Sequence, residues 1–82
     1  MPKPTKPDFH VNELLTLTRN GCEYRFDCIS ENGSDEFKCV HVTRVWDADP
    51  PDTPPDEMGM WTHNGARAMW QTLVSGGYIP KS

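Results

Sequence analysis

Two Asn-Gly dipeptides, Asn20-Gly21 and Asn32-Gly33, constrain the fold of this chain more strongly than any other local feature. Each stands between segments in which apolar and polar residues alternate, the pattern of half-buried β-strands. Asn-Gly favours the two-residue type I′ turn of a β-hairpin, because both central residues of that turn need a positive φ. The sequence therefore predicts an antiparallel three-stranded meander, with strands at about 13–19, 22–30 and 35–46.

The first turn sets Leu17 opposite Tyr24 and Leu15 opposite Phe26, which brings four apolar side chains to one face of the meander. This pairing depends on the first segment being a strand.

The competing interpretation of residues 8–21 is a short helix. It would begin with Asp8 as its N-cap, carry Glu13 in its first turns and end at Gly21. The β-branched Thr16 and Thr18 favour the strand, because β-branched side chains lose rotamer freedom in a helix.

The register of the second hairpin can be tested by burial. A two-residue turn sets Cys28 opposite Phe37, Phe26 opposite Cys39 and Tyr24 opposite His41. A three-residue loop would move Glu36 and Lys38 to the aromatic side and is rejected, whereas a four-residue loop keeps the faces and shifts the pairs. The second and third strands then supply an apolar face made of Tyr24, Phe26, Cys28, Phe37, Cys39 and Val45.

The opposite face of the predicted sheet mixes charged and apolar side chains. Its apolar members are Leu14, Ile29, Val40, Val42 and Trp46. A fully solvated face would not need them, so the leader, the long loop or a partner is expected to cover them. Self-association through Ile29, Val40 and Val42, giving a homodimer, is one interpretation.

Residues 47–59, DADPPDTPPDEMG, are predicted to form a long acidic loop. Its four prolines remove backbone donors and bias the residues before them towards extended conformations, so neither strand nor helix is expected. Five of the twelve acidic residues of the chain fall here without a Lys or Arg: Asp47, Asp49, Asp52, Asp56 and Glu57. Loops of this length are often functional, and Trp46 and Trp61 at its ends are aromatic residues of the kind enriched at binding interfaces.

A C-terminal helix is predicted at about 63–75. Apolar residues follow the helical period along one side: Ala66, Met69, Trp70, Leu73 and Val74. Thr62 or Asn64 can cap its start, and Gly76-Gly77 can end it. We expect the helix to lie across the aromatic face of the sheet with Trp70 as its anchor, which makes the fold class α+β.

Three cysteines and a histidine, Cys22, Cys28, Cys39 and His41, have the ligand types of a zinc site. Cys22 and Cys28 lie about 20 Å apart on one strand at about 3.3 Å per residue, too far to share an ion. Neither a metal site nor a cofactor is therefore predicted, and a metal or redox module on the cysteines ranks below a binding function. Likewise Cys39 and His41, about 7 Å apart along their strand, do not make a catalytic pair, so no catalytic residue is assigned and an enzyme is not expected.

The redox state of Cys28 and Cys39 depends on the second turn. A four-residue turn would let them face each other and form a disulfide. Free buried thiols are favoured, because no export signal precedes the domain.

Length and charge exclude several classes. The 82 residues make one small domain from residue 8 onwards, preceded by a Pro/Lys leader at 1–7, and the lean core leaves stability marginal. The net charge is −4 and the basic residues are scattered, which disfavours nucleic acid and membrane surfaces as partners. No apolar run has the length of a membrane span or a signal-peptide core, so a cytoplasmic location is expected.

The C-terminal run GARAMWQTLVSGGY, residues 65–78, resembles an A-R-x-x-W-x-x-L-V-x-x-G-Y pattern of small uncharacterised bacteriophage and bacterial proteins. The resemblance implies a phage-type accessory protein, a class that often binds and modulates a host protein.

The leading hypothesis is a non-enzymatic protein that binds another protein. The acidic loop, together with Trp46 and Trp61, would contact a basic surface on that partner. The alternative is a structural protein that self-associates through the outer face of the sheet.

Overall fold

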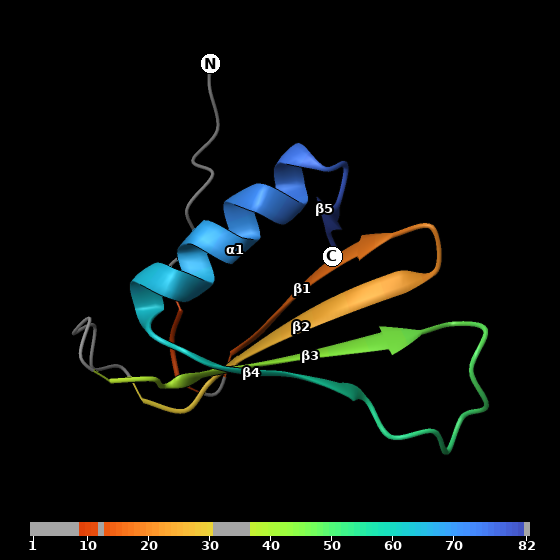
Figure 1. The fold of residues 1–82 in the computed structure, drawn as a ribbon, viewed down its shortest axis with the longest axis horizontal. Coiled ribbons are helices and arrows are strands. Elements are labelled where there is room, and N and C mark those ends of the chain that lie inside the picture. The colour runs from red at the N-terminus through yellow and green to blue at the C-terminus, as the bar shows by residue number, and fades with distance from the viewer. Residues whose placement is uncertain (1–8, 12, 31–36, 82) are drawn as a thin grey trace.

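The computed structural model describes residues 9–11, 13–30 and 37–81. It shows an α+β fold in which an antiparallel five-stranded sheet carries one helix across one face (Figure 1). The elements are β1 (Leu14–Arg19), β2 (Cys22–Cys28), β3 (Val40–Trp46), β4 (Asp56–Trp61), α1 (His63–Ser75) and β5 (Ile79–Pro80). The order across the sheet is β4-β3-β2-β1-β5, so β4 and β5 form its edges. The predicted fold class and helix are confirmed, but the prediction of three strands missed β4 and β5.

The first hairpin is confirmed. Asn20 and Gly21 both have positive φ, 50° and 82°, as the predicted type I′ turn requires. Leu17 lies opposite Tyr24 and Leu15 opposite Phe26, the predicted pairs. Residues 14–19 of the segment for which a helix was the alternative therefore form a strand.

The predicted register of β2 and β3 is wrong by three residues. Cys28 lies opposite Val40 and Phe26 opposite Val42, not opposite Phe37 and Cys39. Tyr24 likewise lies opposite Arg44 rather than His41. The burial test took Phe37 for a core residue, yet its side chain is 54% exposed. The Asn32-Gly33 turn lies outside the described residues.

The register error reverses the two faces of β3, because three is an odd number and side chains alternate along a strand. Val40 and Val42, predicted to lie on the outer face, are fully buried beneath α1. Leu14 and Ile29 remain exposed, at 55% and 58%. The predicted self-association surface of Ile29, Val40 and Val42 therefore does not exist on the outer face.

Strand β4 occupies part of the predicted loop 47–59, so the prediction of no strand there is wrong. It pairs with β3, with Trp61 opposite Val40 and Asp56 opposite Arg44. The pairing contains a β-bulge in which Met58 and Gly59 together face Val42. An edge position explains why a strand can directly follow two prolines, since no further strand must bond to it. The connection between β3 and β4 is thus residues 47–55.

Helix α1 has the predicted ends. The Thr62 hydroxyl accepts a hydrogen bond from the backbone N–H of Gly65 at 3.0 Å and caps the first turn. At the other end Gly77 has φ 101°, and the N–H of Tyr78 donates to the carbonyl of Leu73 at 3.0 Å. This Schellman motif turns the chain back so that β5 pairs with β1.

The core lies between α1 and the sheet. Trp70 is 7% exposed, and its ring lies 5.2 Å from that of Phe26, which confirms it as the anchor of the helix. Phe9, from the segment before β1, stacks on Phe26 at 5.7 Å and closes the core on one side. None of the described residues forms a helix with the length and apolar character needed to cross a lipid bilayer. The predicted leader at residues 1–7 lies outside the described residues.

Candidate functional site

The acidic loop of residues 47–55 projects from one end of the sheet, at the right of Figure 1. Two turns build it. The N–H of Asp49 donates to the carbonyl of Trp46 at 3.1 Å, and that of Thr53 donates to Pro50 at 3.0 Å. The N–H of Asp47 also donates to the carbonyl of Gly21 at 2.8 Å, which ties the base of the loop to the first hairpin turn. The loop therefore has a defined backbone shape rather than being an open connection.

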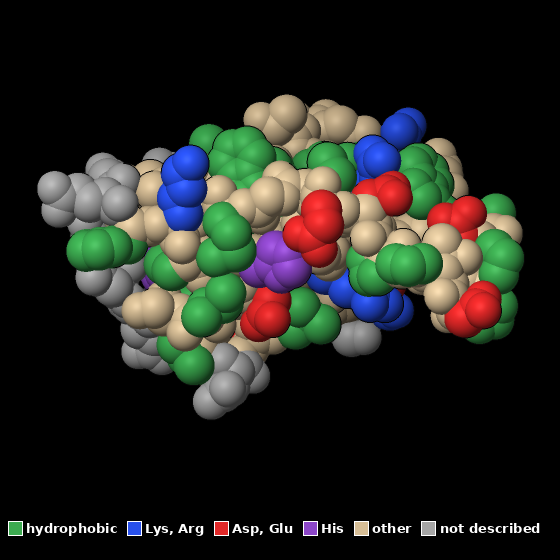
Figure 2. All heavy atoms as spheres, turned by 60° about the horizontal axis from the view of Figure 1, so that its bottom comes forward, with side chains coloured by type: hydrophobic (Ala, Val, Ile, Leu, Met, Phe, Trp, Pro, Cys, Tyr) green, Lys and Arg blue, Asp and Glu red, His purple; other side chains and the backbone are tan. Residues whose placement is uncertain are grey.

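Three loop carboxylates face solvent. Asp47, Asp49 and Asp52 are exposed, and no Lys, Arg or His of the described residues forms an ion pair with them. Figure 2, which looks from the β4 side of the sheet, shows acidic side chains at the end of the molecule where the loop projects. This end of the protein therefore presents negative charge that no ion pair within the described residues neutralises.

Asp56, at the start of β4, is held differently. Its Oδ2 accepts hydrogen bonds from Arg44 at 2.9 and 3.1 Å and from the indole N–H of Trp46 at 3.2 Å. The Arg44 guanidinium lies 5.1 Å from the centre of a Trp46 ring, in cation–π contact. The hydrogen bond from Arg44, followed by that from Trp46, lowers the pKa of Asp56 below its ordinary value. Asp56 thus fixes Trp46 at the base of the loop while its own charge is balanced.

The other two residues of the predicted site lie along β4. Glu57 pairs with His41 across the β3–β4 ladder at 2.7 Å. Trp61 lies at the far end of β4, where its indole N–H donates to the carbonyl of Met58 at 2.9 Å. Trp46 pairs with Cys22 and Trp61 with Val40, at opposite ends of β3. The structure therefore brings Trp46 to the acidic loop but places Trp61 in a different part of the surface.

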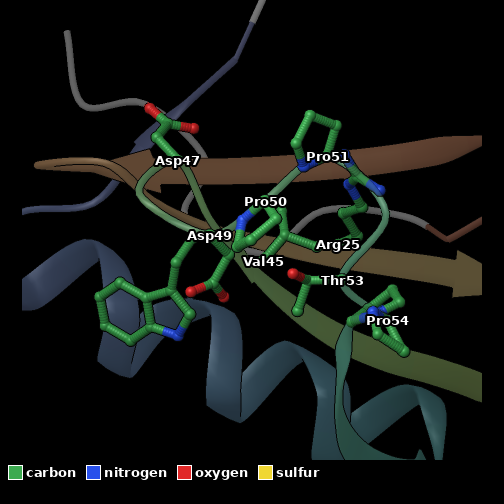
Figure 3. A pocket seen from close by; sticks show the side chains of 10 residues that line it. Arg25, Val45, Asp47, Asp49, Pro50, Pro51, Thr53 and Pro54 are labelled. Carbon is green, nitrogen blue, oxygen red and sulfur yellow. The ribbon is translucent and has the colours of Figure 1, made fainter.

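A hollow of about 400 Å³ lies between the acidic loop and the end of the sheet (Figure 3). Its floor includes Val45 and Arg25, and its walls are largely loop prolines. In the close view the Asp49 and Thr53 side chains project into the space beside Pro50, while Asp47 projects away from it. Arg25 is bound to Glu23 at 2.6 Å, so its charge does not neutralise the loop.

A second hollow, also about 400 Å³, is almost entirely apolar and lies between α1 and β4. Met58 and Trp61 of β4 and Tyr24 of β2 line the sheet side. Gly65, Ala68 and Leu73 contribute to the helix side. Sequence reasoning missed this groove because it assigned residues 56–59 to a loop. The helical period of Gly65, Ala68 and Thr72 was visible in the sequence, but only the position of β4 turns that side of the helix into a wall.

The cysteines do not gather. All three are buried and none of them forms a disulfide, and Cys22 and Cys28 lie at opposite ends of β2. No three His, Cys, Asp or Glu side chains of the described residues lie close enough together to hold a metal ion. Cys28 instead meets His63, with Sγ 3.6 Å from Nε2, and the Ser30 carbonyl lies within hydrogen-bond distance of both. Sequence reasoning assigned no role to His63; its burial at the first turn of α1 comes from the way the helix crosses the end of β2.

Comparison of the chain with protein-family models, with curated proteins and with solved structures gives no significant match.

Proposed function

We propose that this chain is a non-enzymatic binding protein that acts on another protein in the cytoplasm, and that the acidic loop contacts a basic surface of that partner. The observation that carries the proposal is the set of three exposed carboxylates, Asp47, Asp49 and Asp52, which form no ion pair with the described residues. Charged groups that no internal contact uses are free to steer and orient a partner.

The shape of the loop supports this role. Two hydrogen-bonded turns and four prolines restrict its backbone, so little conformational entropy is lost when a partner binds. Trp46 lies beside the carboxylates, 42% exposed and fixed by Asp56 and Arg44. A held aromatic ring next to unpaired charges is a typical combination for the anchor of a protein interface.

The resemblance of residues 65–78 to small bacteriophage and bacterial proteins suggests a host protein as the partner. Self-association through the outer face of the sheet is not retained, because Val40 and Val42 are buried in the core.

The test compares two double variants with the same net charge. Asp49→Asn with Asp52→Asn removes charge from the loop, and Glu13→Gln with Asp27→Asn removes it from exposed positions elsewhere. Partners are captured from the source cell on immobilised protein, identified by cross-linking mass spectrometry, and measured again in purified form. Binding is measured at 50 mM salt, because higher salt screens charge pairs at an interface. We expect the loop variant to weaken binding about tenfold and the control variant to change it less than twofold. Equal binding by both variants would refute the proposal.

A further inference from the structure

The apolar groove between α1 and β4 lies directly beside an open sheet edge. Strand β4 pairs with β3 on one side, and no strand of the described residues pairs with its other side. The groove opens on the inner face of the same strand, and its walls include Met58 and Trp61 of β4 and Gly65, Ala68 and Leu73 of α1. A strand that joined β4 at this edge would therefore have the groove beneath its inward side chains.

Two features prepare this edge for a second backbone. Gly59 has no side chain to block an approaching strand, and its φ of 98° forms the bulge. The Trp61 indole is fixed by its hydrogen bond to Met58 and packs against Gly65, where an added Cβ would lie 3.3 Å from the ring. The groove wall is thus preformed, which reduces the entropy lost on binding.

We propose that β4 receives an extended segment of the partner protein as a sixth strand, with alternate apolar side chains of that segment in the α1–β4 groove. This inference rests on the proposed function, because it identifies what part of the partner is bound. Strand addition next to a helix is a known mode of peptide recognition, in which backbone hydrogen bonds give affinity and pockets for alternate side chains give specificity.

Charge defines one end of the segment. Strand β4 directly follows the loop that carries the exposed carboxylates of Asp47, Asp49 and Asp52, which form no ion pair with the described residues. The six residues of β4 span about 20 Å at about 3.3 Å per residue, so a segment of similar length reaches the loop with its terminal residue. The end of the segment that lies beside Asp56 therefore carries Lys or Arg.

A second copy of this chain fits the edge less well. A copy would bring its own acidic loop, and each chain has a net charge of −4. Charge complementarity thus favours a basic segment of another protein.

The experiment selects peptides from a displayed library of random twelve-residue sequences on the immobilised full chain. The expected result is enrichment of peptides with apolar residues at every second position and Lys or Arg at one end. Enrichment of apolar residues at helical spacing, or of no common pattern, overturns the proposal.

The bound geometry is tested on one enriched peptide. A strand at an edge directs alternate N–H groups to its neighbour, so N-methylation of one alternating set should weaken binding more than tenfold and of the other set less than twofold. Equal effects of the two sets contradict strand addition. The free chain is also measured by light scattering and by hydrogen exchange. If it is a dimer and its β4 amides are protected without peptide, a second copy occupies the edge and the proposal is overturned.

Variants separate this inference from the proposed function. Ala68→Trp fills the groove from an exposed helix position and should weaken the peptide at least tenfold, whereas Ser75→Trp, exposed on the same helix but outside the groove, should change it less than twofold. The loop variant Asp49→Asn with Asp52→Asn should weaken the peptide about threefold to tenfold. If only Ala68→Trp weakens peptide binding, the groove binds the peptide and the proposed role of the acidic loop is refuted. If only the loop variant weakens peptide binding, the proposed role of the groove is refuted.

Discussion

At the residue scale, the charged side chains of this protein differ in the ionic and hydrogen-bonded contacts that they make. Glu23 is 9% exposed on the outer face of the sheet, where Arg25 at 2.6 Å and Lys81 at 3.0 Å bind its two carboxylate oxygens. The hydrogen bond from Arg25 is the main cause of a lowered pKa of Glu23, against the opposing effect of burial. The Lys81 contact also joins the end of the chain to β2.

Glu23→Gln should therefore lower the free energy of unfolding by about 1 kcal/mol at pH 7, the scale of a partly exposed charged hydrogen-bond pair. A carboxyl with a lowered pKa in the folded state contributes stability above its unfolded pKa and loses it as pH falls through the folded pKa. The difference between wild type and variant should shrink as pH falls below about 4. Urea denaturation at pH 7 and pH 3 measures this, and a difference that is constant with pH would contradict it.

Tyr78 has a raised pKa. Its hydrogen bond with Cys22, together with burial, raises the pKa of Tyr78 to about 12. A raised pKa means that the folded state favours the neutral phenol, so this contribution to stability is present below the ordinary pKa of about 10 and is lost as pH rises through about 12. Absorbance titration at 295 nm should show a step near pH 12 that Tyr78→Phe removes. If the variant retains that step, the assignment to Tyr78 is wrong.

At the element scale, β3 decides the fold. Its register with β2 turns Val40 and Val42 towards α1 and His41 and Val45 towards the outer face. Its other side holds β4, with the Arg44–Asp56 and His41–Glu57 pairs connecting the two strands. The acidic loop is positioned by the end of β3 and the start of β4, so its place depends on this register.

A pair of substitutions tests the register directly. Val42→Ala should lower the free energy of unfolding by about 2 kcal/mol, because it removes two methyl groups from a fully buried site. Val45→Ala should cost less than about 0.5 kcal/mol, because Val45 is partly exposed on the other face. Chemical denaturation of both variants measures the contrast. If Val45→Ala lowered the free energy of unfolding more than Val42→Ala, the result would instead support the register that a two-residue Asn32-Gly33 turn predicts.

At the scale of the whole molecule, negative charge gathers at one end and apolar packing at the centre. The loop carboxylates are balanced by no contact among the described residues, so removing them should not weaken the fold. We expect Asp47→Asn, Asp49→Asn and Asp52→Asn together to leave the free energy of unfolding within about 0.5 kcal/mol of wild type, since surface substitutions without a structural role have effects of this size. A larger loss in thermal denaturation would show that the loop charges serve the fold rather than a partner.

The sequence by itself determined the elements whose causes are local. The Asn20-Gly21 turn needs only the positive φ of two residues, and α1 needs only its apolar period, the Thr62 cap and Gly77. The acidic character of the loop is likewise a property of composition. Each of these depends on residues within a few positions of one another, which is why they could be read without the fold.

Only the tertiary structure decided the register of β3, the existence of β4 and therefore the two surfaces of the candidate site. The register depends on which of two apolar pairs faces α1, Phe37 and Val45 or Val40 and Val42, and both pairs satisfy alternation equally. Strand β4 contains a glycine and follows two prolines, so its local preference is weak, and pairing with β3 supplies the stability that it lacks. The apolar groove arises where β4 meets α1, a contact between separate elements that periodicity within either one does not encode.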